Sequence, residues 1–485
     1  MRGQGAAGGS PGDVPPLAAA TSAPPPAAAL PRRVRLGYGA GDLGGSLTFV
    51  AVNTWLLYYL VDIAGMRPLS AGLVFVLGRV FDALTDPLMG IVSDRLRWRL
   101  GRKPFIAWGA PWLGLAFLGL WALPTLRPGH AFAVALASML LFSLFYTVVQ
   151  VPYIALTPEL APDYDERTAL SSYRVAFGTL ASLIAVAVPP AIVLRLSPGS
   201  VLAASAPRGW TLMGAVFALV TVLAYAWVSA AVPEPRRAPA AGPREDLRDV
   251  RTVFAIPGYR ELFSLFLAVT VGIMIVNSML PFTLESALRI PGPQQTPVLG
   301  LLFACAIAAF PLWTWLSARI GKRLTLVLGL ITLSLGLLPL TLAVPVGRVS
   351  ASLLAMAVVA GAGLSAVMLL PWAMLPDVVE FDELTTGRRR EGVVVALFTF
   401  GQKLAGSVGV FANAIAATVF GYVPGAAVQA AGTVRGLRAM TGPVAVAVFV
   451  VALLLTLRFP ITRAQHAAAR RALAERRSAP SGPGA

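Results

Sequence analysis

Residues 69–103 read L-S-A-G-L-V-F-V-L-G-R-V-F-D-A-L-T-D-P-L-M-G-I-V-S-D-R-L-R-W-R-L-G-R-K, and this stretch decides the fold. It contains an apolar run long enough to cross a bilayer, which takes about twenty residues, and it ends in a dense basic loop. Arg79, Asp82 and Asp86 lie near the middle of the run and share one helix face, because they are three and four residues apart. A charge at the centre of a membrane helix costs about 2.5–3.5 kcal/mol, so this face must meet protein or water.

Asp82 and Asp86 are like charges placed side by side. Two such carboxylates repel each other unless a cation or a proton lies between them. The helix therefore predicts a cation site inside a membrane protein. The alternative is an Arg–Asp network with Arg79 that only fastens helices together.

The composition supports a polytopic helical membrane protein. The chain has 485 residues, of which 57% are hydrophobic and 13% charged, and its mean hydropathy is +0.74. Globular proteins are about 45–50% apolar and about 25% charged. One cysteine, Cys305, cannot form a disulfide framework. The two histidines, His130 and His466, fall in a presumed loop and a tail, so we expect neither a histidine metal site nor a histidine proton relay.

The apolar segments predict an all-α protein with twelve transmembrane helices in two pseudo-symmetric six-helix bundles. The expected spans are residues 37–63, 69–93, 104–124, 131–157, 171–196, 210–232, 262–284, 297–317, 324–344, 350–375, 392–420 and 443–458. They divide the chain into a disordered Ala- and Pro-rich tail (1–35), an N-terminal bundle (36–232), a basic linker (233–261), a C-terminal bundle (262–458) and a basic tail (459–485).

The basic residues alternate from loop to loop. The net charge is +17, but its distribution indicates membrane orientation rather than nucleic-acid binding. If the N-terminus is cytoplasmic, the inner segments hold 27 Lys and Arg residues and the outer loops hold 8. We therefore expect a multi-pass protein of the cell membrane with both tails and the linker in the cytoplasm.

The two halves of the chain repeat short features six spans apart. G-R-K at residues 101–103 follows the second span, and G-K-R at residues 321–323 follows the eighth. P-Y at residues 152–153 ends the fourth span, and P-W at residues 371–372 ends the tenth. A parallel repeat of two six-helix halves is typical of a two-lobed transporter whose site lies between the lobes.

Lys403 is the strongest candidate partner for the acids of the second span. It lies about eleven residues, or about 16 Å, inside the eleventh span, and Asp82 lies at a similar depth in the second. An ammonium group that deep favours an acid across a cavity. The alternative is a lysine bound only to backbone carbonyl groups.

Other spans carry polar side chains at membrane depth. Tyr146, Thr147 and Gln150 lie in the fourth span and could ligate a hard cation, which prefers oxygen, or form a hydrogen-bonded packing stripe. Arg174 is either a substrate donor or an interfacial anchor. Trp372 could stack on a sugar or an acyl group, or serve only in packing. Asp42, near the inner end of the first span, could equally form a salt bridge to a loop arginine or take part in transport.

These residues together resemble the glycoside–pentoside–hexuronide:cation symporters, the melibiose-permease-like branch of the major facilitator superfamily. The matching stretches are Y-G-A-G-D-L-G (38–44), D-A-L-T-D-P-L-M-G (82–90), Q-V-P-Y-I-A-L-T-P-E-L (150–160), P-D-V-V-E-F (376–381) and G-Q-K (401–403). They fall in both halves and in similar order. The resemblance implies the major facilitator fold over most of residues 36–458.

The resemblance also implies a site for sodium, lithium or a proton. Carried over position by position, its ligands would be Asp82, Thr85, Asp86 and Thr147. An Asn stands at the position of Thr85 in the well-studied sugar permeases, so the choice of cation is open. Lys403 matches the lysine of the eleventh helix that faces those acids.

The implied sugar pocket is matched only in part. Tyr146 and Arg174 match pocket positions of the family. Ser46 and Gln150 stand where the melibiose-type permeases place sugar-binding acids, and Ile154 stands in place of a stacking aromatic residue. A carboxylate accepts sugar hydroxyls more strongly than an amide or a hydroxyl does. We interpret this as a retained cation site beside an altered galactoside pocket.

The sequence therefore predicts cation-coupled symport by alternating access. A sugar or glycoside is the first candidate substrate, and a lysophospholipid is the second, because the related animal lysolipid symporters keep the same acids and lysine. We expect Tyr146, Gln150, Arg174, Ser46, Trp372 and Lys403 to contact the substrate. Ion pairs of Arg79, Asp94, Arg95 and Lys403 would hold one conformation. We expect a monomer among membrane lipids, driven by Na⁺ or H⁺ and using no cofactor.

Two other classes compete with this prediction. A membrane enzyme or receptor would need a catalytic constellation or a soluble domain, and the sequence shows no nucleophile–base set, no metal-ligand cluster and no Gly-rich phosphate loop. A passive facilitator would leave Asp82 and Asp86 unexplained. Dependence on an ion gradient separates a facilitator from a symporter.

Overall fold

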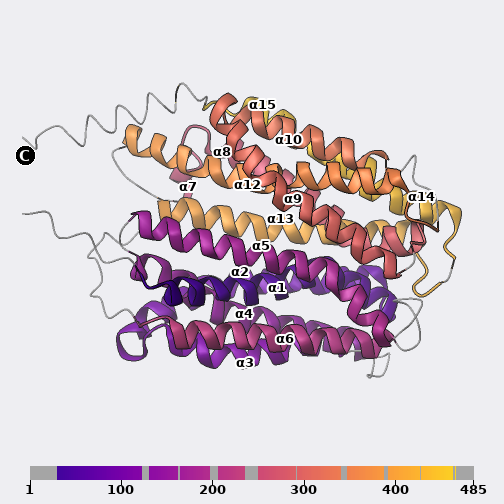
Figure 1. The fold of residues 1–485 in the computed structure, drawn as a ribbon, viewed down its shortest axis with the longest axis horizontal. Coiled ribbons are helices and arrows are strands. Elements are labelled where there is room, and N and C mark those ends of the chain that lie inside the picture. Colours follow the sequence, from indigo (N-terminus) through magenta and orange to yellow (C-terminus); the bar gives the residue numbers. More distant parts are fainter. Residues whose placement is uncertain are drawn as a thin grey trace, which may run out of the picture.

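The computed structural model describes residues 30–122, 130–161, 164–196, 206–234, 250–290, 292–339, 347–386, 391–426, 428–461 and 465. These residues form long helices that run roughly side by side (Figure 1). The predicted N-terminal tail, linker and C-terminal tail lie mostly outside the described residues.

The first six long helices follow one another through the N-terminal half. They are α1 (Arg32–Tyr58), continued by the π-helical turn η1 (Tyr59–Ile63), then α2 (Pro68–Leu100), α3 (Lys103–Leu120), α4 (Ala131–Leu160), α5 (Tyr164–Leu196) and α6 (Ala206–Ala231). A single short turn, α7 (Val250–Val253), precedes the second half.

The C-terminal half contains six more. They are α8 (Tyr259–Phe282) with η5 (Thr283–Ala287), α9 (Gly292–Ile320), α10 (Lys322–Leu337), α12 (Ala351–Thr386), α13 (Glu391–Val419), and α14 (Ala431–Ala439), which runs through η6 (Met440–Val444) into α15 (Ala445–Arg458). The two halves form the lower and upper layers of Figure 1.

Ten of these twelve helices are both long enough and apolar enough to cross a membrane. The other two, α3 and α10, have 18 and 16 residues. At 1.5 Å per residue they still extend for about 27 and 24 Å, close to the thickness of the hydrocarbon core. The predicted fold, twelve helices in two halves, is confirmed.

The prediction for the last span was wrong at its start. The helix begins at Ala431 rather than at residue 443. Two arginines and two glycines in residues 432–438 resemble a loop in sequence, but Arg438 donates a hydrogen bond to the carbonyl oxygen of Ala287 (3.4 Å). Pro443 lies within the π-helical turn η6, where a wider backbone accommodates its missing N–H.

The repeated G-R-K and G-K-R motifs have the same local structure. Gly101 and Gly321 both adopt a positive φ, 80° and 90°, which is strained for any residue with a Cβ. Each glycine makes the tight turn into the next helix, α3 or α10. The next residue of each motif, Arg102 or Lys322, forms an ion pair; that of Lys322 is with Asp377 (2.6 Å).

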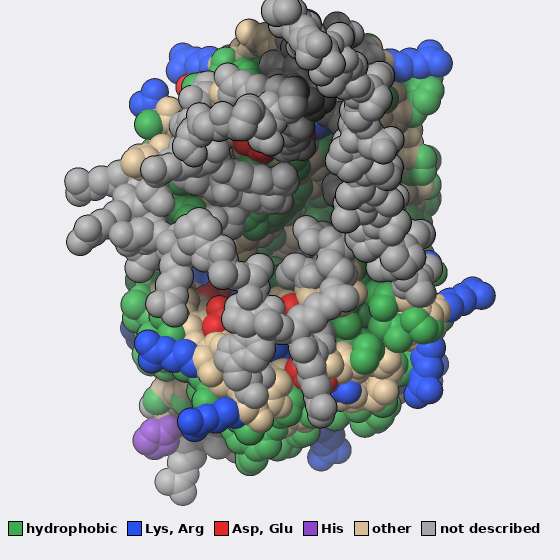
Figure 2. All heavy atoms as spheres, turned by 90° about the vertical axis from the view of Figure 1, so that its left-hand side faces the viewer, with side chains coloured by type: hydrophobic (Ala, Val, Ile, Leu, Met, Phe, Trp, Pro, Cys, Tyr) green, Lys and Arg blue, Asp and Glu red, His purple; other side chains and the backbone are tan. Residues whose placement is uncertain are grey.

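Figure 2 views the end of the molecule at which α1 begins. Lys and Arg side chains lie around the edge of this face, whereas carboxylates lie nearer its middle. At the opposite end, near α14, aromatic rings join the two halves: Tyr58 of α1 packs edge-on against Phe282 of α8, with centroids 5.2 Å apart. The candidate site lies between these two ends.

Candidate functional site

Two of the cavities lined by described residues lie between the halves, and α1 contributes residues to both. The larger, about 530 Å³, is lined by α1, α5, α9 and α12. The smaller, about 300 Å³, is lined by α1, α2, α4, α8 and α13. The structure thus divides the predicted substrate residues into two groups. Ser46, Arg174 and Trp372 line the larger cavity, and Tyr146, Gln150 and Lys403 line the smaller.

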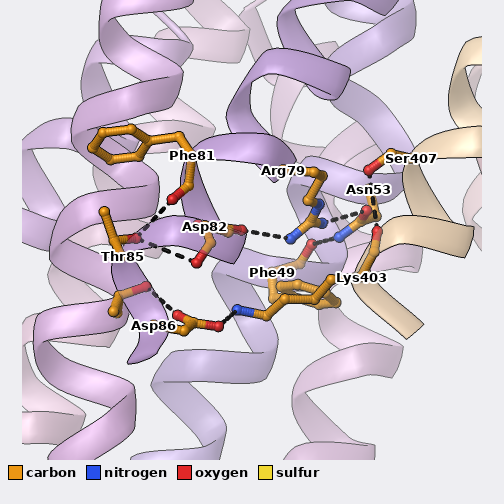
Figure 3. A network of polar contacts seen from close by, with 10 residues as sticks. Phe49, Asn53, Arg79, Phe81, Asp82, Thr85, Asp86, Lys403 and Ser407 are labelled. Atoms are coloured by element: carbon orange, nitrogen blue, oxygen red, sulfur yellow. Dashed lines mark hydrogen bonds and ion pairs between the residues drawn. The ribbon is translucent and has the colours of Figure 1, made fainter. Parts of the chain in front are cut away.

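Asp86 is the point at which three helices meet in the smaller cavity (Figure 3). The hydroxyl of Thr147, from α4, donates to Oδ1 of Asp86 (2.6 Å). The ammonium group of Lys403, from α13, forms an ion pair with Oδ2. Lys403 belongs to the other half of the molecule, so this ion pair joins the halves. The side chains are only 28% and 16% exposed, so water screens their attraction weakly.

Asp82 has a different basic partner. One nitrogen of Arg79 donates to Oδ2 of Asp82 (3.1 Å), and another donates to the side-chain carbonyl of Asn53 on α1 (3.0 Å). All three residues are buried. Each carboxylate of the second helix therefore has its own protein cation in this conformation, Arg79 for Asp82 and Lys403 for Asp86.

Thr85 lies between Asp82 and Asp86 in the sequence, but its hydroxyl donates to the side-chain carboxylate of neither. Its hydroxyl donates to the backbone oxygen of Phe81 (3.0 Å), one turn earlier in α2. A hydroxyl that bonds back to its own helix keeps its oxygen lone pairs available as acceptors. Among the described residues no group of three or more His, Cys, Asp or Glu side chains could hold a metal ion. A cation at Asp86 would need hydroxyl oxygens as further ligands.

Arg174 closes one end of the larger cavity through an ion pair with Asp42. Its guanidinium donates two hydrogen bonds to the Asp42 carboxylate (2.8 and 3.3 Å) and lies over the ring of Tyr153, 5.4 Å from the centroid. The contact joins α5 to α1. The partner of Arg174 is therefore Asp42, a residue of another helix. The sequence alone did not identify this pair.

Ser46 and Trp372 face the same larger cavity from opposite halves. Ser46 approaches α5 closely at Gly178, where an added Cβ would lie 3.1 Å from the serine hydroxyl. Trp372 packs edge-on against Phe266 and Phe398, with centroids 5.5 and 5.1 Å apart. Trp372 is 37% exposed, so part of its ring remains free for contact with a substrate.

Tyr146 and Gln150 are held in place by neighbours in the N-terminal half. The ring of Tyr146 lies near those of Phe49 and Phe142, with centroids 5.8 and 5.7 Å away. The side-chain oxygen of Gln150 accepts a hydrogen bond from the Tyr225 hydroxyl (2.7 Å). These contacts fix the wall of the smaller cavity beside Asp86.

Arg102, rather than Arg95, is the centre of the predicted ion-pair network after α2. Its buried guanidinium donates to Asp94 (2.8 Å), to Glu159 (2.9 Å) and to the hydroxyl of Ser93 (2.9 Å). Arg95 is exposed. The position of Arg102 directly after the glycine turn could have identified it, since the turn directs it back toward α2.

Asp62 and Tyr422 join the two halves at the end near α14. Both oxygens of the Asp62 carboxylate accept the Tyr422 hydroxyl (2.8 and 2.9 Å), and one also accepts the backbone N–H of Gly425 (3.0 Å). Burial and the neighbouring Asp62 raise the pKa of the Tyr422 hydroxyl, so it remains a donor at neutral pH. No sequence pattern predicts this contact, because its partners are 360 residues apart in the chain.

Comparison with known proteins agrees with this architecture. The model of the family described as MFS/sugar transport protein matches residues 37–463. An uncharacterized symporter of Synechocystis is 27% identical, with 91% of this chain and 96% of the relative covered. A glucuronide carrier protein homolog of Escherichia coli is 28% identical, with 89% and 93% covered. The sodium-dependent lysophosphatidylcholine symporter 1 of Mus musculus is 27% identical, with 77% and 75% covered.

Solved structures show the same fold at low sequence identity. A bacterial homolog of the human lysosomal transporter Spinster, in an inward-facing and occupied conformation, has a TM-score of 0.67 at 14% identity, with 90% of this chain and 97% of that chain covered. A nucleoside transporter has a TM-score of 0.61 at 12% identity, with 88% and 98% covered. The family match covers both halves and both cavities, and the chain therefore belongs to the MFS/sugar transport protein family of multi-pass membrane symporters.

Proposed function

We propose that the protein couples the entry of Na⁺ or H⁺ to the movement of an organic substrate by alternating access. The observation that carries this proposal is the meeting of Asp86, Thr147 and Lys403 inside the membrane, between the two halves. A carboxylate whose partner belongs to the opposite half links its own charge state to the contact between halves. The names of the mouse and cyanobacterial relatives, both symporters, support coupled transport.

The chemistry of coupling follows from the two oxygens of Asp86. Thr147 uses Oδ1, and Lys403 uses Oδ2. A proton or a sodium ion on Asp86 competes with the ammonium group of Lys403, because one carboxylate cannot neutralise both. Release of Lys403 removes an ion pair between the halves and frees an ammonium group to face the substrate. Coupling then requires that cation and substrate favour the same conformation.

The larger cavity favours a substrate with a polar head and an apolar body. Asp42, Ser46 and Arg174 form its polar end, whereas most of the other lining residues, such as Phe303 and Met368, are apolar. We propose a glycoside with an apolar aglycone as the first candidate, within the melibiose-permease-like branch. The Escherichia coli relative named as a glucuronide carrier homolog supports a sugar with an apolar or anionic substituent.

A lysophospholipid is the second candidate, and the same apolar lining favours it. An acyl chain would contact the apolar walls, and the phosphate would lie near Arg174, which binds phosphate and carboxylate groups well. The relative from Mus musculus bears the name of a sodium-dependent lysophosphatidylcholine symporter. Ile154, exposed in the smaller cavity, is compatible with an amphiphile and provides no stacking surface for a sugar ring.

The proposal includes an orientation in the membrane and an oligomeric state. The basic residues at the end where α1 begins support an orientation with that end, and both tails, in the cytoplasm of a cell-membrane protein. The Arg102 network with Asp94 and Glu159 then lies on the cytoplasmic side and stabilises one conformation of the N-terminal half. We propose a monomer that works among membrane lipids.

Uptake into proteoliposomes tests the proposed function. Purified protein is reconstituted and offered a labelled glycoside panel and one labelled lysophospholipid, under an inward sodium gradient or an inward proton gradient. Accumulation of a glycoside driven by either ion supports the first candidate and identifies the ion. Accumulation of the lysolipid alone supports the second candidate. Substrate uptake that depends on neither ion gradient would contradict coupled transport.

A further inference from the structure

The guanidinium group of Arg79 is shared between two acceptors that belong to different helices (Figure 3). One nitrogen donates to Oδ2 of Asp82 within α2, and the other donates to Oδ1 of Asn53 on α1. The group also lies over the ring of Phe49, 4.9 Å from the centroid. Two residues of α1 therefore hold an arginine that α2 supplies.

This sharing leaves the Asp82 carboxylate only partly neutralised. Its Oδ1 is buried and has no hydrogen-bond partner among the described residues. An arginine beside a carboxylate commonly donates two parallel hydrogen bonds, one to each oxygen. Here the second nitrogen of Arg79 is engaged by Asn53 instead. The unpaired Oδ1 is thus the consequence of a competing acceptor on α1.

Asn53 is itself fixed in the orientation that this competition requires. Its amide nitrogen donates to the backbone oxygen of Phe49 (2.7 Å), so its side-chain oxygen faces Arg79. Asn53 is only 4% exposed. It also lines the smaller cavity, in which Asp86 and Lys403 lie.

Asn53 lies on α1, the helix that also lines the proposed substrate cavity. α1 carries Asp42 and Ser46 into the larger cavity and Phe49 and Asn53 into the smaller one. Residues of one rigid helix move together when a ligand displaces it. A substrate that engages Ser46 therefore acts on the Asn53–Arg79 hydrogen bond through α1.

We propose that Asn53 is a positioning residue that sets the affinity of Asp82 for the coupling cation, by competing with Asp82 for Arg79. The proposal rests on the proposed function, since it assigns the cation site to the acids of α2. When Asn53 holds Arg79, Asp82 keeps a free oxygen for a cation. When the contact is lost, Arg79 closes on both oxygens of Asp82 and excludes the cation.

Two substitutions at position 53 distinguish this role from simple packing, because they act in opposite directions. Asn53→Leu keeps the number and branching of the side-chain heavy atoms but has no acceptor, so Arg79 is free to bind both oxygens of Asp82. The cation concentration for half-maximal transport should rise about tenfold, as for loss of one charged hydrogen bond. Asn53→Asp has the same shape and draws Arg79 away from Asp82, so the half-maximal concentration should fall.

The measurement is made on the full chain in proteoliposomes. Sodium is titrated at fixed pH, and proton concentration is titrated without sodium, at saturating substrate; the KM for substrate is measured at saturating cation. Thr54→Val, a near-isosteric change on α1, is the control and should leave the half-maximal concentration unchanged. If the leucine variant does not reach the membrane, Asn53→Ala removes the same acceptor.

The outcomes separate the inference from the proposed function. Opposite shifts of the Leu and Asp variants, with the KM for substrate nearly constant, support the inference. Shifts in the same direction, or none, overturn it while the wild type remains ion-dependent. Wild-type transport that depends on neither sodium nor proton concentration would overturn the proposed function and this inference with it.

Discussion

A single oxygen of Asp86 is the object of competition in the proposed cycle. In the structure, Lys403 forms an ion pair with Oδ2, while Thr147 donates to Oδ1. Both contacts occupy oxygens of the carboxylate. A coupling cation that binds Asp86 must therefore displace the ammonium group of Lys403, and its affinity for Asp86 reflects the strength of this ion pair.

Lys403→Gln should strengthen cation binding. Glutamine cannot compete as a cation, so the half-maximal concentration of the coupling ion should fall about tenfold, the effect of about 1.4 kcal/mol. The measurement is a titration of ion-dependent substrate binding to purified protein. Lys322→Gln is a matched control, because Lys322 pairs with Asp377 and lines neither cavity. An unchanged or raised half-maximal concentration in the Lys403 variant would contradict the competition.

At the scale of helices, close contact in the C-terminal half depends on glycines. A Cβ added at Gly336 of α10 would overlap the backbone of Ala360 in α12. A Cβ at Gly363 of α12 would likewise overlap the backbone of Leu333 in α10. The reciprocal positions let the two helices touch at backbone distance, as small residues commonly do in membrane helix pairs.

Gly336→Ala should destabilise this helix pair. The added methyl group has no space without separation of the backbones, and such overpacking typically costs about 1–3 kcal/mol. Thermal unfolding of the purified protein in detergent measures the effect as a lower Tm. Gly300→Ala in α9 is the control, because its added Cβ has no neighbour within 4 Å. Equal Tm values for the two variants would disprove the close contact.

The sequence predicted the positions of the helices better than it predicted which side chains pair between them. Hydropathy fixes how deep a residue lies, and equal depth was enough to expect Lys403 opposite the acids of α2. Hydropathy does not fix how each helix is rotated about its axis. The partners of Asn53 and Arg102 therefore emerged only from the structure, and so did the pairing of Asp62 with Tyr422.

The two arginines of α14 explain why the predicted start of the last span was wrong. Charged residues near the end of a span count against a membrane helix in any hydropathy measure. Arg438 nevertheless lies inside a continuous helix and reaches the carbonyl oxygen of Ala287. A long side chain near a membrane surface can direct its charge outward or to a neighbour at small cost.

At the scale of the whole molecule, polar contacts between described residues join the halves at two depths. Asp86 and Lys403 meet in the middle, and Asp62 and Tyr422 meet at the end near α14, which is the outer end in the proposed orientation. Alternating access requires both to break and reform as the halves rotate. The outer contact, together with the Tyr58–Phe282 rings, holds that end closed in this conformation.

Tyr422→Phe should shift the protein toward the state that opens at the outer end. The change removes the hydroxyl from Asp62 but keeps the ring that packs against Phe282. Loss of a hydrogen bond to a carboxylate is worth about 1.5–3 kcal/mol, so the equilibrium should move about tenfold or more. Spin-label distances between the outer ends of α2 and α13 measure the populations.

Tyr259→Phe is the control for this shift. The Tyr259 hydroxyl donates to the backbone oxygen of Val394, within the C-terminal half, so its removal leaves the contacts between halves intact. The control should retain the wild-type distance distribution. The same distribution in the Tyr422 variant would show that the Asp62 contact does not hold the outer end closed.

The central claim, coupling through Asp86, is tested most directly by gradient-driven uptake with Asp86→Asn in proteoliposomes. Asparagine keeps the shape of the side chain but cannot carry the negative charge that pairs with Lys403 and, in the proposed cycle, binds the cation. The account predicts that this variant no longer accumulates substrate against its gradient, while exchange of substrate across the membrane continues. Normal concentrative uptake by the variant would contradict the account.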